Sequence, residues 1–148
     1  MIIRVRRSAA LAALACGVAV LPLSTARAEV VTLSGDMKGT NEAPPNDSPA
    51  TGRAEAKFDT ATRQLSWNVT YSGLTGPAAG AHFHGPAEPG KNAGIVVPFA
   101  TGASPIAGST TLNEKQAEDL LAGRWYANIH SAKHPGGEIR GQVTRQGQ

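Results

Sequence analysis

Short segments in which apolar and polar residues alternate dominate the chain from residue 30 onward. In the clearest one, 65–71, every second residue is Leu, Trp, Val or Tyr and the residues between are Ser, Asn or Thr. Such alternation is typical of a strand with one buried face. The same criterion, or a short apolar run, predicts further strands at 30–34, 54–58, 95–99, 124–130 and 138–144. The turn-like residues 59–64 predict that 54–58 and 65–71 form a hairpin.

One segment has the period of a helix instead. Asn113 and Gln116 have the spacing of a capping box, in which each side chain bonds the other residue's backbone N–H. Ala117 and Leu120 then fall on one face, and Gly123 suits the end of a helix. The pattern predicts one short helix between residues 113 and 123.

Glycine and proline punctuate the predicted strands. The chain contains 17 Gly and 10 Pro residues, which favours many turns and argues against a helical bundle. Three prolines in 41–49 predict an extended loop that cannot lie inside a sheet. We therefore expect an all-β fold: an antiparallel Greek-key sandwich or barrel of about eight short strands, with one short helix.

Residues 1–28 have the pattern of a signal peptide. Three arginines precede the apolar run 9–21, and Ala26-Arg27-Ala28 resembles a cleavage site. The run is shorter than the roughly 20 residues that a membrane-spanning helix needs. We expect cleavage near Ala28, no transmembrane helix, and export of residues 29–148 as one domain to the periplasm or the medium. A lipid anchor at Cys16 and twin-arginine export through Arg6-Arg7 are the alternatives.

Cleavage would change both the charge and the thiol content. The whole chain carries 14 basic and 11 acidic residues, net +3, but four of the basic residues and no acidic ones lie in 1–28. The remainder then has 14 − 4 = 10 basic against 11 acidic residues, net −1, and no cysteine. A near-neutral surface does not concentrate phosphates, so nucleic-acid binding is not expected.

The four histidines occur in two groups, His82 with His84 and His130 with His134. Residues i and i+2 of a strand share a face, so His82 and His84 can converge on one ion. Parity places both opposite the apolar face of their strand, and the same test places His130 outward. We expect an outward-facing copper or zinc site formed by His82, His84 and His130, with His134 as a possible fourth ligand.

Three polar residues of the last two predicted strands lie on the histidine side by the same parity: Asn128, Glu138 and Arg140. We expect them around the metal ligands, with Glu138 accepting the second N–H of His130. Glu42 and Glu138 are otherwise expected to be solvated.

Two alternatives remain open. The histidine face, with Tyr126 and Arg140, could contact a protein or glycan without any metal. Copper-dependent redox activity would need an open coordination position. No nucleophile triad, phosphate-binding loop or dinucleotide motif is present, so the sequence identifies no catalytic residue and no particular protein partner.

The assembled motifs resemble the CHRD domain, the module named after chordin and found alone in exported bacterial proteins. The resemblance rests on Leu33-Ser34-Gly35, Asn41-Glu42-Ala43-Pro44-Pro45, Ala81-His82-Phe83-His84-Gly85-Pro86-Ala87, Gly123-Arg124-Trp125-Tyr126-Ala127-Asn128-Ile129-His130 and Pro135-Gly136-Gly137-Glu138-Ile139-Arg140-Gly141-Gln142. It implies an all-β, immunoglobulin-like or barrel domain. His134 stands where this family is expected to have Asn. A fainter similarity to copper/zinc superoxide dismutase implies an outward His-x-His copper pair, but the dismutase cysteines and zinc loop are missing.

Overall fold

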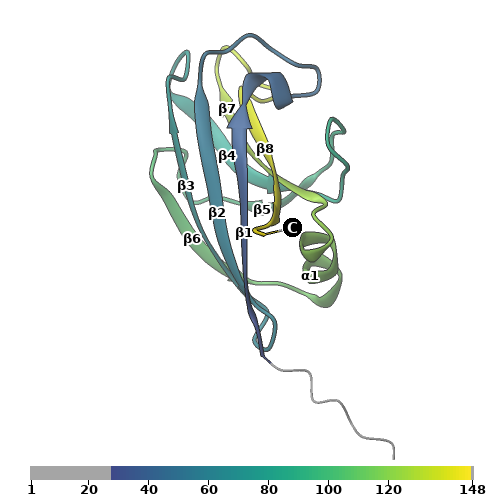
Figure 1. Ribbon diagram of the computed structural model, residues 1–148. Helices are drawn as coiled ribbons and strands as arrows, with labels where there is room; N and C mark the ends of the chain where they lie inside the picture. The colour runs from purple at the N-terminus through teal and green to yellow at the C-terminus, as the bar shows by residue number, and fades with distance from the viewer. Residues whose placement is uncertain (1–27, 148) are drawn as a thin grey trace, which may run out of the picture.

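The computed structural model describes residues 28–147, which form one antiparallel sheet of eight strands (Figure 1). The strands follow one another across the sheet in the order β5-β4-β7-β8-β1-β2-β3-β6. Their bounds are β1 Val30–Lys38, β2 Thr51–Asp59, β3 Gln64–Ser72, β4 Ala78–His84, β5 Ile95–Pro98, β6 Ile106–Thr111, β7 Trp125–Ser131 and β8 Ile139–Arg145. A 3-10 turn, η1 (Gly39–Asn41), follows β1, and the helix α1 (Glu114–Leu121) connects β6 to β7.

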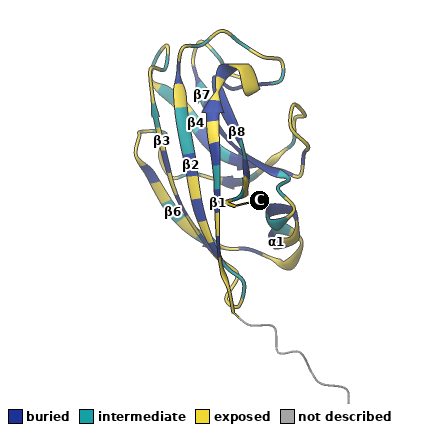
Figure 2. Cartoon of the chain, in the orientation of Figure 1, coloured by how far each residue is buried: buried dark blue, intermediate teal, exposed yellow. Residues whose placement is uncertain are grey.

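The sheet is curled, so that its two halves enclose the core. Trp67 of β3 contacts Phe83 of β4, with ring centroids 5.6 Å apart, although four strands separate β3 from β4 in the sheet. Trp67 also stacks on Phe99, just beyond β5. Along β1, β2 and β3 buried residues alternate with more exposed ones, as the apolar alternation predicts, and the colours of Figure 2 change accordingly along these strands. The predicted all-β antiparallel fold with one short helix is confirmed.

The β2–β3 hairpin and the helix form as the local sequence predicts. Phe58 pairs with Leu65 across the hairpin, and the Asp59 carboxylate accepts two backbone N–H groups within the turn. At the helix, Asn113 and Gln116 make both hydrogen bonds of the capping box. Gly123 follows the helix with φ of +71°, a conformation that favours glycine.

β6 was not predicted, because it lacks the usual apolar alternation. Its residue Gly108 pairs with Trp67, and a Cβ atom at this position would lie 2.3 Å from Cζ2 of the indole. The indole therefore occupies the space that an inward-facing side chain of β6 would otherwise fill.

β7, which carries His130, is covered on both faces, and β4, which carries His82 and His84, is partly covered. In β7, every residue except His130 is buried. One face packs on the core, and loop residues from 39–50 and 85–94 hydrogen-bond to groups on the other. The expectation of an outward face was therefore correct about side-chain parity, and for exposure it fails only at His84, since His82 and His130 are partly exposed.

The predicted signal peptide, its cleavage site and Cys16 fall in residues 1–27 or at the edge of that segment, outside the described part of the chain. Among residues 28–147 no helix has the length and apolar character needed to cross a membrane.

Candidate metal centre

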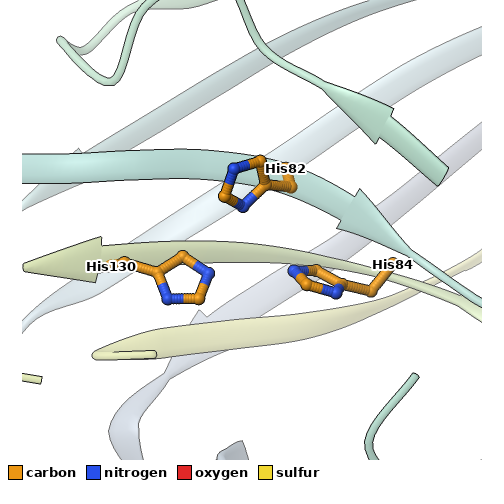
Figure 3. Close-up of side chains that lie close together, drawn as sticks. All are labelled: His82, His84 and His130. Atoms are coloured by element: carbon orange, nitrogen blue, oxygen red, sulfur yellow. The ribbon is translucent and has the colours of Figure 1, made fainter. Parts of the chain in front are cut away.

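Three histidines from two neighbouring strands face one another. His82 and His84 lie on β4, and His130 lies beside them on β7, where it pairs with Gly80 (Figure 3). The ring centroids are 5.1 Å apart for His82 and His130, 5.5 Å for His82 and His84, and 5.9 Å for His84 and His130. One ring nitrogen from each residue lies within 4.8 Å of the other two. The predicted convergence of these three side chains is confirmed.

Backbone carbonyl groups fix the orientation of two of the rings. Nδ1 of His84 lies 3.0 Å from the carbonyl oxygen of Ala93, and Nδ1 of His130 lies 2.9 Å from that of Pro135. A carbonyl oxygen only accepts hydrogen bonds, so each Nδ1 carries the proton. Nε2 of His84 and of His130 then has a free lone pair, as a metal ligand requires.

One ring nitrogen of each of the three histidines is buried and has no hydrogen-bond partner among the described residues. They are Nδ1 of His82, Nε2 of His84 and Nε2 of His130. A buried polar atom without a partner is costly, and three in one place call for a shared explanation. A bound cation supplies one, because it accepts all three lone pairs, and imidazole nitrogens suit copper and zinc. The donor set therefore fits either ion.

The surroundings of His82 and His84 favour the neutral imidazole. Burial lowers the pKa of His82, and the neighbouring His130 and His84 lower it further. Burial also lowers the pKa of His84, whose side chain is almost fully covered, although its hydrogen bond to Ala93 opposes the shift. Neutral imidazole is the form that binds a metal.

Tyr126 and Ala93 hold His84 in place. The Tyr126 ring stacks on the His84 ring, with centroids 4.9 Å apart and planes at 2°. Its hydroxyl accepts the N–H of Ala93, whose carbonyl accepts Nδ1–H of His84. The Arg140 guanidinium lies 4.3 Å from the Tyr126 ring centroid.

Arg140, which lies over the Tyr126 ring, also forms a buried ion pair with Glu42. Nε of Arg140 donates to Oε2 of Glu42 at 2.7 Å, and Nδ2 of Asn128 donates to Oε1 of the same carboxylate. Arg140 also donates to the carbonyl of Lys91 and to the Asn92 side chain. Glu42 is thus buried and paired, and the expectation that it is solvated was wrong. No local pattern indicates this pairing, since Arg140 lies 98 residues further along the chain than Glu42.

Glu138 does not accept a hydrogen bond from His130, contrary to expectation. The backbone carbonyl of Pro135 accepts the N–H of His130 instead. The Glu138 carboxylate accepts hydrogen bonds from the Ser48 hydroxyl and from both the N–H and the hydroxyl of Thr75. Burial raises the pKa of Glu138, but these and other hydrogen bonds outweigh it and leave the pKa below its usual value. Glu138 is buried rather than solvated. Its hydrogen bonds connect its own loop to the loops that contain Ser48 and Thr75.

The other residues predicted near the site are placed as follows. Asn128 and Arg140 lie on the histidine side of the sheet, and both donate hydrogen bonds to Glu42. Their connection to the imidazoles is indirect: Arg140 lies over the ring of Tyr126, and Tyr126 stacks on His84. His134 lies in the turn after β7, where its N–H bonds to Ser131, and it is not part of the three-histidine group. Tyr126 and Arg140 are 2% and 4% exposed, so these two side chains are not available for contact with a protein or glycan.

Fold and site together define a small antiparallel β-domain with a candidate three-histidine metal centre. The chain belongs to the CHRD domain family, whose family model matches residues 33–143. No curated protein and no solved structure matches it. The fainter similarity to copper/zinc superoxide dismutase is therefore not supported.

Proposed function

We propose that this CHRD-domain protein is exported and binds a copper or zinc ion through His82, His84 and His130. The observation that carries the proposal is the group of three unpartnered ring nitrogens, each within 4.8 Å of the others. In two of the rings the backbone already fixes the tautomer that a metal requires. A site that only packed histidines together would have no reason to leave all three lone pairs without donors.

A metal-free interaction module has less support. The polar residues considered for such a surface are used inside the protein, where Arg140 pairs with Glu42 and Tyr126 stacks on His84. For redox catalysis at copper, the described residues identify neither a substrate nor an open coordination position. Metal binding or handling without catalysis is therefore the function that we propose.

Export is supported by the sequence of the first 28 residues, which combine basic residues, a short apolar run and a small-residue cleavage site. Expression of the full chain in a bacterium, followed by fractionation and N-terminal sequencing, tests it. We expect periplasmic or secreted protein that begins at Glu29. Protein that remains in the cytoplasm with residues 1–28 attached would contradict export without affecting the metal site.

Isothermal titration of the purified protein with Cu(II) and with Zn(II) tests the metal function. We expect one ion to bind per chain with a dissociation constant below about 1 μM, equivalent to about −8 kcal/mol. The His82→Ala variant should lose at least 100-fold in affinity, whereas His134→Ala, outside the group, should bind as the wild type does. Equal binding by both variants would show that the ion sits elsewhere.

A further inference from the structure

We infer that the three-histidine group binds copper as Cu(I) in preference to Zn(II) and Cu(II). This inference rests on the metal-binding function proposed above and concerns the identity and charge of the ion. It follows from two features of the site, the number of donors that it offers and the charge that its surroundings tolerate.

The group offers three donors and no fourth. Within residues 28–147, it contains His82, His84 and His130 but no Cys, Asp or Glu. The protein itself therefore supplies no fourth ligand, and a divalent ion would have to complete its coordination with water. Zn(II) in proteins almost always has four ligands, and Cu(II) prefers a tetragonal arrangement. Cu(I) is a d¹⁰ ion that is stable with three nitrogen donors, and it alone matches the number available.

Nearby charged groups cannot complete the coordination. The Glu42 carboxylate accepts from Arg140 with one oxygen and from Asn128 with the other. The Glu138 carboxylate is likewise bonded to Ser48 and Thr75. Recruiting either carboxylate to an ion would leave a buried donor or cation without its partner, which is unfavourable.

The charge of the site also favours a monovalent ion. Its three ligands are neutral imidazoles, and the nearest buried charges, Arg140 and Glu42, neutralise each other. A divalent ion would add two uncompensated positive charges to a largely buried position. Because the Born cost of burying an ion grows with the square of its charge, Cu(I) costs about a quarter as much as a divalent ion of similar size.

Three competition titrations test the preference. Under anaerobic conditions, the purified protein competes with bicinchoninate for Cu(I), and separate titrations with matched chelators give its affinities for Zn(II) and Cu(II). We expect Cu(I) to bind at least 100-fold more tightly than either divalent ion. A 100-fold preference over Cu(II) also raises the potential of the bound copper couple by about 120 mV relative to aqueous copper.

X-ray absorption of the copper-loaded protein tests the coordination number directly. We expect three nitrogen neighbours at about 2.0 Å and no fourth ligand. The His134→Ala variant should keep the Cu(I) affinity, and His82→Ala should lower it at least 100-fold, with circular dichroism used to check that both fold. Equal or tighter binding of Zn(II) or Cu(II), or a fourth ligand on Cu(I), would overturn the cuprous assignment and leave the metal site standing. Failure of all three ions to bind would overturn both proposals.

Discussion

Tyr126 lies flat against His84, with ring planes at 2° and centroids 4.9 Å apart. The tyrosine hydroxyl accepts the N–H of Ala93, while the carbonyl of the same residue accepts the imidazole N–H. Both rings are thereby hydrogen-bonded to one residue of the 85–94 loop. Folding therefore fixes the direction of the His84 lone pair before any ion arrives.

Removal of the Tyr126 ring should weaken metal binding. Tyr126→Leu abolishes the stack and leaves His84 held by one hydrogen bond, so we expect affinity to fall about 10-fold to 100-fold, as is usual when a group that orients a ligand is lost. Tyr126→Phe keeps the ring and should cost less. Competition titration with the metal measures both. Wild-type affinity in Tyr126→Leu would show that the stack does not orient His84.

Some of this site could be predicted from sequence because it depends on local geometry. The spacing of His82 and His84 places them on one face of a strand, and the parity of His130 places it on the same side of the sheet. The capping box of Asn113 and the β2–β3 hairpin are equally local and were predicted for the same reason.

The rest depends on contacts between distant segments. His84 is buried because the loop around Ala93 folds over it, and nothing in the strand itself indicates this. Glu42 lies in a proline-rich loop that is polar enough to be solvated, yet it pairs with Arg140 from the last strand. The strand at Gly108 was missed because its inward space is filled by Trp67.

Breaking the Glu42–Arg140 pair should destabilise the fold. Both side chains are nearly inaccessible, so Glu42→Ala leaves a buried guanidinium without its counterion. We expect a loss of about 3–5 kcal/mol in the free energy of unfolding, measured by urea denaturation. Asp36→Ala removes a partner from the exposed Arg53 pair and serves as the control, with little or no expected change in stability.

The double variant Glu42→Ala with Arg140→Met gives a sharper test of that explanation. It removes the buried Arg140 charge as well as the Glu42 carboxylate, so the double variant should be more stable than Glu42→Ala alone. If the double variant is instead the less stable of the two, the cost comes from lost packing and not from an unpaired charge.

Stability of the metal-free protein should depend on pH through the two histidines of β4. Burial lowers the pKa of His82 and of His84 in the folded state below the value of about 6.5 in the unfolded chain. As the pH falls below about 6.5, the unfolded chain binds protons before the folded protein does, so the free energy of unfolding decreases. The decrease ends below the folded-state pKa values, where both states are protonated.

Urea denaturation in the presence of a chelator, between about pH 7.5 and pH 5, measures this dependence. The His82→Gln and His84→Gln double variant keeps Glu42, Glu138 and the other titrating groups, so the difference between the two curves isolates the histidine contribution. We expect a flatter curve for the double variant. Parallel curves would mean that the two imidazoles titrate alike in folded and unfolded protein.

A side chain at Gly108 should disrupt the packing between β3 and β6. A Cβ atom there would lie 2.3 Å from Cζ2 and 2.7 Å from Cε2 of Trp67, closer than non-bonded carbon atoms approach. The indole cannot retreat easily, because it stacks on Phe99 and meets the edge of Phe83. We expect Gly108→Ala to lower the free energy of unfolding by about 1–3 kcal/mol, the usual cost of overpacking a core. Gly76→Ala is the matched control, since nothing lies within 4 Å of its added methyl group and its stability should change little. Equal stability of the two variants would show that β6 can move away from the indole at no cost.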